Sequence, residues 1–270
     1  MSKILFSDLD GTLLDNDKQI SKGNREAIRR ALRAGHSFVI ATGRPFESAK
    51  RISDSLGLNE EGSFIVSYNG AHVYDCYQKK DLLKKTLPLN IADELFARAE
   101  AADLYIHTYQ NGEIVTKQDS EELRWYASRT NLRPMPRADV IDYLTDAPCK
   151  MIVIHLSDHE RLERFRKENE AWAKGKCRMM FSCQEYLEIV PDGVSKQSGI
   201  QFLSDLLHVS PQDTIAIGDE TNDAEMIQAA GLGVAVANAN PAVQRIADYV
   251  TKATNNEDAI AEVIDRFVLV

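Results

Sequence analysis

Short apolar runs alternate with amphipathic segments along the first part of the chain. The runs at residues 3–8, 36–41 and 64–66 are short and continuous, as in strands buried on both faces. Between them, helices are predicted at residues 21–34 and 45–56, because apolar side chains recur there every three or four positions. Strands that alternate with helices form right-handed βαβ units, so this region predicts a parallel sheet.

The pattern changes in the middle of the chain. Asn111-Gly112 separates two short apolar runs, and this pair favours a tight hairpin because both residues tolerate positive φ. The elements expected here are hairpins at residues 104–116 and 178–190, helices at 90–102, 120–129 and 158–174, and a strand at 150–156. Hairpins pair their strands antiparallel, which indicates an α+β unit inserted into the parallel core.

Alternation of strands and helices resumes after Pro191-Asp192-Gly193. The predicted fold class is therefore α/β, with a Rossmann-like parallel-sheet core and an inserted α+β domain. We expect the discontinuous core to comprise residues 1–83 and 191–270, and the insert to comprise residues 84–190.

Polar residues directly follow three of the apolar runs. They are Asp8 to Thr12 after the first run, Thr42 to Arg44 after the second, and Asp219 to Asp223 after the strand predicted at 214–218. In open parallel sheets, ligands bind outside the carboxyl ends of the strands. If these three strands are neighbours, their polar residues converge on one site.

Asp8 and Asp10 suggest the chemistry of this site. A carboxylate can attack phosphorus and form an aspartyl-phosphate, while a second one can protonate the leaving oxygen and then activate water. Two adjacent carboxylates repel each other unless a cation intervenes, which points to Mg²⁺. The ordinary alternative is a polar loop in which an aspartate caps the next helix.

The remaining polar residues also have ordinary explanations. Asp219 and Asp223 suit a helix N-terminus as caps, although such a terminus also presents N–H groups to a phosphate. Thr42 suits a turn, yet its hydroxyl and the Gly43 backbone also suit phosphate oxygens. Lys196 begins a predicted helix, where a cation is unfavourable unless carboxylates or an anion lie opposite.

Composition restricts the partners. A formal net charge of −9 argues against nucleic acid or an anionic membrane surface. An anionic substrate therefore needs local positive charge, for which the candidates are Lys196, Arg44, a divalent cation and backbone N–H groups. The N-terminal residues lack the layout of a signal peptide and the four cysteines lack metal-ligand spacing, so we expect free thiols and a cytoplasmic location.

Four motifs together resemble a known family. They are the DxDGT sequence at residues 8–12, Thr42 at a second strand end, the KxxG sequence at 196–199 and the GDxxND sequence at 218–223. This set resembles the haloacid dehalogenase superfamily of phosphatases. Its order and spacing are similar to the Cof-type sugar-phosphate phosphatases, which carry a large type-2 (C2B) cap between the second and third motifs. Two departures are Glu220 beside Asp219 and Ala259 where relatives usually carry glycine.

The resemblance implies roles for the matching residues. Asp8 would be the nucleophile and Asp10 the general acid and base. Mg²⁺ would be held by Asp8, the Asp10 backbone carbonyl and Asp219, with Asp223 supporting it directly or through water. The residues implied to hold the phosphoryl group are the Leu9 backbone, Thr42, Gly43, Lys196 and Asn222. Arg44 and Asn69 are further candidates for substrate contact.

The expected function is a Mg²⁺-dependent phosphatase that acts on small phosphorylated metabolites, such as sugar phosphates, through an aspartyl-phosphate. One alternative is a phosphomutase that uses the same nucleophile, and another is a catalytically inactive metabolite-binding protein. The expected partner is a small phosphorylated metabolite rather than nucleic acid or a membrane. The sequence predicts neither the physiological substrate nor the oligomeric state.

Overall fold

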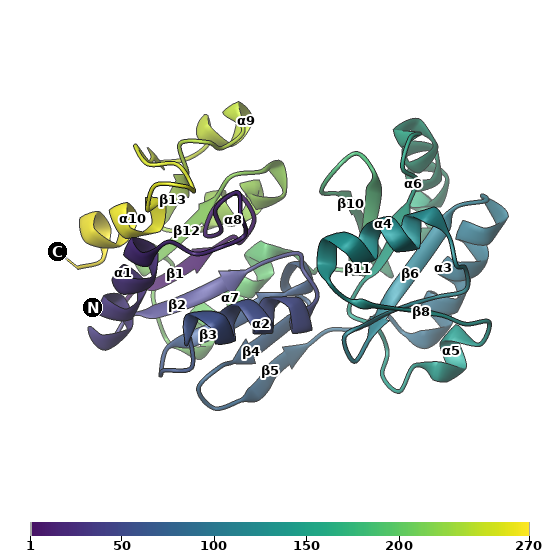
Figure 1. The fold of residues 1–270 in the computed structure, drawn as a ribbon, viewed down its shortest axis with the longest axis horizontal. Coiled ribbons are helices and arrows are strands. Elements are labelled where there is room, and N and C mark those ends of the chain that lie inside the picture. The colour runs from purple at the N-terminus through teal and green to yellow at the C-terminus, as the bar shows by residue number, and fades with distance from the viewer. Residues whose placement is uncertain (1, 270) are drawn as a thin grey trace. The chain divides into compact units, whose positions relative to one another are not determined.

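A computed structural model describes residues 2–269 and divides the chain into two compact units (Figure 1). The first unit, called the core unit here, comprises Met1–Gly43, Ala49–Leu83 and Ser195–Val270. The second unit comprises Lys84–Val194 together with the short segment Arg44–Ser48.

The core unit is built on an eight-stranded sheet with the order β14-β13-β12-β1-β2-β3-β4-β5. Its strands are β1 (Ile4–Ser7), β2 (Ser37–Ala41), β3 (Ser63–Ser67), β4 (His72–Asp75), β5 (Lys80–Lys84), β12 (Thr214–Gly218), β13 (Leu232–Ala235) and β14 (Tyr249–Val250). Every pair from β14 to β3 is parallel. The predicted α/β class with a Rossmann-like parallel sheet is therefore confirmed.

Strands β4 and β5 at the end of this sheet were not expected from the sequence. β4 pairs antiparallel with β3, so the sheet is mixed at this edge. The sequence signal is weak because β5 is exposed or half-exposed and does not alternate, and because Lys79 rather than glycine takes the positive φ in the preceding turn.

Helices pack on the core sheet. They are α1 (Lys22–Arg33), α2 (Phe46–Leu56), α7 (Lys196–Leu206), α8 (Ala224–Ala229), α9 (Pro241–Gln244) and α10 (Ala259–Phe267), with 3-10 turns η1 (Tyr68–Gly70), η2 (Pro211–Asp213) and η3 (Thr221–Asp223). One face of the sheet packs Phe6, Val39 and Val66 against Leu203 of α7 and Met226 of α8. These side chains leave water together, and that burial stabilises the layers.

Helices α1 and α10 cap each other at their N-termini. The Asp258 carboxylate accepts hydrogen bonds from the Ser21 hydroxyl and from the Asn24 N–H (3.2 Å), while Asn24 Oδ1 accepts from the Ala261 N–H (2.9 Å). Asp258 itself takes the positive φ (64°) before α10, and Ala259 is helical. Alanine at position 259 therefore causes no backbone strain.

The second unit contains a six-stranded sheet with the order β10-β11-β9-β6-β7-β8. Its strands are β6 (Tyr105–Gln110), β7 (Glu113–Thr116), β8 (Arg133–Pro136), β9 (Met151–Ile154), β10 (Cys177–Phe181) and β11 (Tyr186–Pro191), and its helices are α3 (Leu89–Ala101), α4 (Glu121–Thr130), α5 (Val140–Tyr143) and α6 (His159–Ala173). Both predicted hairpins form, and Asn111 and Gly112 take φ values of 47° and 78° in the first.

The short strand β8 and helix α5 fall in a stretch that the sequence indicates only as a proline-containing connector. β8 pairs with β7 at the edge of the sheet. Pro134 and Pro136 lack N–H groups, and an edge strand tolerates this because only one of its sides is paired. Ile106, Met151 and Leu187 pack into the apolar core of this unit, with Phe96 of α3 and Phe165 of α6.

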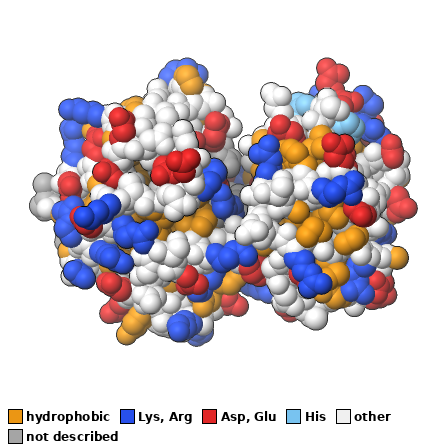
Figure 2. Space-filling view, viewed as in Figure 1, with side chains coloured by type: hydrophobic (Ala, Val, Ile, Leu, Met, Phe, Trp, Pro, Cys, Tyr) orange, Lys and Arg blue, Asp and Glu red, His pale blue; other side chains and the backbone are white. Residues whose placement is uncertain are grey.

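The surface charges, the cysteines and the helix hydropathy also bear on the expectations from the sequence. On the face drawn in Figure 2, acidic and basic side chains are interspersed over each unit. All four cysteines are free. Within residues 2–269, the structure has no helix whose length and hydropathy would suit a membrane span.

Gly23 gives a test of the packing between α1 and α10. A Cβ at this position would lie 2.6 Å from Asp258 Oδ1, closer than unbonded atoms can approach. Gly23→Ala should therefore lower the free energy of unfolding by about 1–3 kcal/mol, although alanine is the better helix former by about 1 kcal/mol. Denaturant unfolding measures the change.

The background variant Asp258→Gly removes the opposing carboxylate and tolerates the positive φ. In that background Gly23→Ala should be neutral or stabilising. Stabilisation by Gly23→Ala in the otherwise unchanged protein would contradict the packing described.

Candidate active site

The three strands that precede the predicted polar segments are adjacent in the core sheet. β1 lies between β12 and β2, in parallel register with both. The Asp8 N–H donates to the Ile217 carbonyl (2.9 Å), which continues this pairing one residue past β1. Asp8, Thr42 and Asp219 thus lie at the same carboxyl edge of the sheet, where ligands bind in such folds.

The loop after β1 bends at Gly11. Gly11 has φ +78°, and a Cβ there would clash with the Asp219 carboxylate, so glycine serves both the turn and the close approach. The Leu14 N–H returns to the Leu9 carbonyl (2.8 Å) and closes the bend. Thr12 Oγ1 then donates to Asp219 Oδ1 at 2.6 Å, which joins this loop to the end of β12.

The Asp223 carboxylate organises the turn after β12. Its Oδ2 accepts hydrogen bonds from the backbone N–H groups of Asp219 (3.1 Å) and Glu220 (3.2 Å). A Cβ on Gly218 would lie 2.6 Å from the Asp223 side chain, so only glycine lets the turn close this tightly. The Glu220 side chain is exposed and caps the Thr221 N–H (3.3 Å).

Lys196 lies opposite these carboxylates, at the start of α7. Its Nζ donates to Asp8 Oδ1 (2.5 Å) and to Asp223 Oδ1 (2.6 Å), and the residue is only 3% exposed. Gly199 brings α7 close to β3, since a Cβ there would lie 2.7 Å from Val66. The two ion pairs explain why a lysine at a helix N-terminus is stable here, because the two carboxylates outweigh the unfavourable helix dipole.

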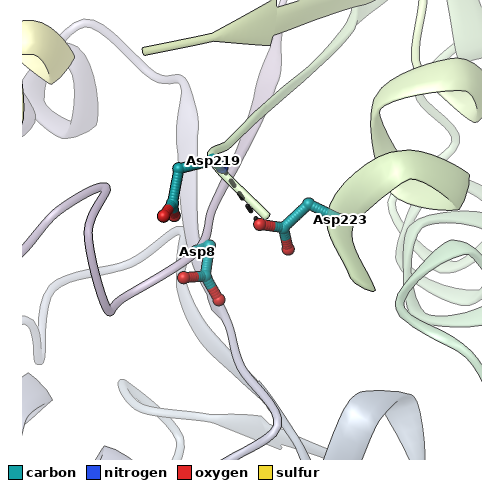
Figure 3. A group of neighbouring side chains, drawn as sticks. All are labelled: Asp8, Asp219 and Asp223. Atoms are coloured by element: carbon teal, nitrogen blue, oxygen red, sulfur yellow. Dashed lines mark hydrogen bonds between the residues drawn. The ribbon is translucent and has the colours of Figure 1, made fainter. Parts of the chain in front are cut away.

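Asp8, Asp219 and Asp223 form a buried cluster that could hold a metal ion (Figure 3). One oxygen of each lies within 4.8 Å of the others. Burial raises the pKa of Asp8 well above its ordinary value, with the charges of Lys196 opposing and Asp223 adding to this shift. Burial likewise raises the pKa of Asp219 to about 7, partly offset by the hydrogen bond from Thr12.

The charge of this cluster is unbalanced. Burial disfavours the Lys196 ammonium, but the Asp223 and Asp8 carboxylates outweigh it and raise the lysine pKa. Three ionised carboxylates would face this one ammonium and leave two negative charges in excess. Such a buried excess is costly unless protons or a cation neutralise it.

Thr42 and Gly43 follow β2 and are supported by Asn69. The Asn69 N–H donates to the Thr42 carbonyl (3.1 Å), and a Cβ on Gly43 would lie 2.7 Å from Asn69 Oδ1. Asn69 is buried with φ 58°, a conformation that asparagine tolerates better than most residues. Arg44 is grouped with the second unit, and its Nη1 donates to Ser48 Oγ (3.4 Å).

Other predicted residues lie near the cluster without joining it. The Asp10 carboxylate is 41% exposed and accepts a hydrogen bond from Lys18 Nζ (2.8 Å), so it is not one of the three clustered carboxylates. Asn222 is half-buried in the η3 turn. Leu9 is fully buried, and its carbonyl is used within the loop.

Sequence reasoning assigned no role to several residues that hold this site together. They are Thr12, Lys18, Asn238 and Asn255. Asn238 Nδ2 donates to the Gly11 carbonyl (2.8 Å), and Asn255 Nδ2 donates to the Leu14 carbonyl (2.9 Å). Thr12 falls within a recognised motif, whereas the two asparagines lie more than 200 residues after the loop that they contact, with no local signal.

Comparisons with known proteins agree with the geometry. YitU of Bacillus subtilis (strain 168), named as a 5-amino-6-(5-phospho-D-ribitylamino)uracil phosphatase, is 31% identical, with 98% of this chain and 97% of YitU covered. YcsE of the same organism, which carries the same enzyme name, is 29% identical over 99% of this chain and 96% of its own length.

A solved structure of a haloacid dehalogenase-like hydrolase from Bacteroides thetaiotaomicron superposes with a TM-score of 0.90. It is 33% identical, and the match covers 98% of this chain and 99% of that one. The sequence profile described as haloacid dehalogenase-like hydrolase matches residues 5–264. The resemblance drawn from the four motifs is confirmed: this chain belongs to the haloacid dehalogenase-like hydrolase family.

Proposed function

We propose that the protein is a Mg²⁺-dependent phosphatase that hydrolyses small phosphorylated metabolites through a phosphoryl group carried on Asp8. The observation that carries the proposal is the buried cluster of Asp8, Asp219 and Asp223 against Lys196. Such a site suits a nucleophilic carboxylate and an anionic substrate whose charge is met by cations. The names of YitU and YcsE, both phosphatases, support this reaction class.

Asp8 is held as a nucleophile should be. Its backbone N–H pairs with Ile217, and Lys196 fixes Oδ1, while Oδ2 makes no hydrogen bond to the described residues 2–269. Oδ2 would attack the phosphorus atom, forming an O–P bond as the bond from phosphorus to the leaving oxygen breaks. Because these contacts already fix the position of the carboxylate, less entropy is lost when the reacting groups reach the transition state.

Asp10 lies two residues further along the same loop and would handle the protons. In its protonated form it gives its proton to the leaving oxygen, so that an alcohol departs. As a carboxylate it then takes a proton from the water that attacks the phosphorylated Asp8, which releases phosphate and restores both residues. Its partial exposure and its contact with Lys18 leave room for this exchange.

Lys196 and the end of β2 would hold the transferring phosphoryl group. The Lys196 ammonium already faces Asp8 Oδ1, so it lies beside the atoms that carry new negative charge. Thr42 and Gly43, supported by Asn69, would add a hydroxyl and a backbone N–H. Asn222 and the Leu9 backbone are the remaining proposed contacts.

The donor set fits Mg²⁺, which prefers carboxylate oxygens and retains several waters. Asp219 keeps one carboxylate oxygen that has no hydrogen bond within residues 2–269 and would hold the ion together with Asp8 Oδ1, which leaves Asp8 Oδ2 for the attack on phosphorus. Both oxygens of Asp223 are used, by Lys196 and by two N–H groups, so Asp223 would support the site rather than bind the ion. When bound, Mg²⁺ neutralises the excess negative charge and draws electron density from the phosphoryl oxygens.

The proposed substrates are phosphate monoesters of sugars and sugar-derived alcohols. The compound named for YitU and YcsE carries its phosphate on a ribityl chain, which belongs to that chemical class. A panel of sugar phosphates, nucleotides, flavin mononucleotide and this ribityl compound, assayed for released phosphate with Mg²⁺, tests the proposal. Failure to release phosphate from every member would contradict it.

Substitution of Asp8 tests its role as the nucleophile. Asp8→Asn should lower kcat by at least about 10³-fold, because an amide cannot form the covalent intermediate. The near-identical shape should leave the fold intact by circular dichroism. Asp17→Asn, an exposed position on the same loop, is the matched control and should keep normal turnover. Normal turnover by Asp8→Asn would rule out the covalent route.

The binding of Mg²⁺ at Asp219 should depend on pH. Because burial raises the Asp219 pKa to about 7, the metal-free folded protein retains a proton that the unfolded chain loses near pH 4. Its stability therefore falls as pH rises toward 7. Mg²⁺ competes with that proton, so its apparent affinity should be about tenfold higher at pH 8 than at pH 6.

Thermal unfolding with EDTA and with added Mg²⁺ at the two pH values measures this effect. The Mg²⁺-induced rise in Tm should be larger at pH 8, and Asp219→Asn should abolish the rise at both. EDTA should also stop turnover, with Mg²⁺ restoring it. An equal rise at both pH values, or one that persists in Asp219→Asn, would contradict the assignment of Asp219.

A further inference from the structure

The loop that carries Asp10, Gly11 and Thr12 is held from outside by side chains far along the chain. Asn238 Nδ2 donates to the Gly11 carbonyl (2.8 Å), directly between Asp10 and Thr12. Asn255 Nδ2 donates to the Leu14 carbonyl (2.9 Å) and to Asn16 Oδ1 (3.3 Å). Within the loop, the Leu14 N–H donates to the Leu9 carbonyl and helps to close the bend.

The two asparagines are also joined to each other. Asn238 Oδ1 accepts a hydrogen bond from the Asn255 N–H (2.8 Å), so the amide of Asn238 donates to the loop and accepts from the C-terminal segment at once. Asn255 is only 3% exposed. A buried amide such as that of Asn255 is costly unless its groups are paired, and here the pairing links two distant segments.

The same segment reaches Asp219. The Asn240 N–H, two residues after Asn238, donates to the Asp219 carbonyl (2.8 Å). Asp219 Oδ1 in turn accepts from Thr12, which lies on the loop that Asn238 holds. Residues 238–240 therefore contact both the loop, through Asn238, and the end of β12, through Asn240.

We infer that Asn238 and Asn255 are positioning residues that set the catalytic geometry of the loop bearing Asp10 and Thr12. The inference rests on the proposed function and deepens it. Within residues 2–269, neither side chain donates to the three clustered carboxylates; each donates to a loop carbonyl. Displacement of a catalytic group by about 1 Å can cost about 100-fold in rate, so the effect should fall on kcat.

Aspartate at either position is a sharp test, because it keeps the shape and the acceptor but replaces the donor. In Asn238→Asp, one carboxylate oxygen still accepts from the Asn255 N–H, while the other opposes the Gly11 carbonyl. We expect kcat to fall about 10- to 100-fold, with KM changed by less than about threefold. Asn255→Asp should act in the same direction.

The matched control is Gln244→Ala. Gln244 Nε2 donates to the Ala237 carbonyl (2.9 Å), a bond of the same kind within the same segment that does not touch the loop. This variant should keep kcat within about twofold of the unsubstituted protein. It separates loss of loop position from general loosening of the C-terminal segment.

Hydrogen exchange by mass spectrometry gives a readout that does not depend on turnover. Peptides that cover residues 9–16 should exchange faster in Asn238→Asp than in the unsubstituted protein, measured without Mg²⁺. The Gln244→Ala protein should show no change there. Because Asn238 is exposed, its variant tests the inference even if the buried Asn255 variant does not fold.

The outcomes separate the inference from the proposed function. If the unsubstituted protein hydrolyses monoesters and Asp8→Asn does not, unchanged kcat in Asn238→Asp would overturn the inference alone. Equal losses in Asn238→Asp and Gln244→Ala, or unchanged exchange in residues 9–16, would do the same. Failure of the unsubstituted protein to release phosphate would instead overturn the proposed function.

Discussion

The site depends on one interaction, the pairing of buried Lys196 with Asp8 and Asp223. A lone buried ammonium or carboxylate would be strongly unfavourable, and removing one partner of such a group costs about 3–5 kcal/mol. The pairing holds three distant parts of the chain together: β1, the start of α7 and the turn after β12. Its remaining negative charge is what makes the cluster suited to a cation and to a phosphoryl group.

Glycine makes that close arrangement possible. Gly11 and Gly218 let the loops after β1 and β12 pass against Asp219 and Asp223, while Gly199 lets α7 approach β3. Each of these positions would put a Cβ closer than 3.0 Å to a neighbouring side chain. Glycine loses more conformational entropy on folding than other residues do. That loss opposes folding, but it allows charged groups from separate elements to come within hydrogen-bond distance.

Much of this architecture could be predicted, because its signals are local. Continuous apolar runs predict buried strands. Because β12, β1 and β2 are neighbours, the polar residues that directly follow them lie together at the carboxyl edge of the sheet. Asn111-Gly112 predicted its hairpin through the φ values that it permits. The edge strands β5 and β8 lacked such signals, since the exposed strand β5 need not alternate and Pro134 and Pro136 argue against a strand.

The contacts that complete the site could not be predicted, because they join side chains to distant atoms. Thr12 and Asp219 are 207 positions apart, and Asn238 is 227 from Gly11. Neither pairing follows a period of two or 3.6 residues, so no pattern within one element reveals it. The engagement of Asp10 by Lys18 is closer in sequence, yet it depends on a positive φ at Lys18 that lysine rarely adopts.

The central claim is that the phosphoryl group passes through Asp8. Rapid acid quench of a single turnover with radiolabelled substrate and Mg²⁺, followed by peptide mass spectrometry, tests it most directly. The account predicts a transient phosphoryl group on the peptide that contains Asp8, which forms before phosphate is released and is absent in Asp8→Asn. Phosphate release with no labelled protein at any time, or a label on a different residue, would contradict it.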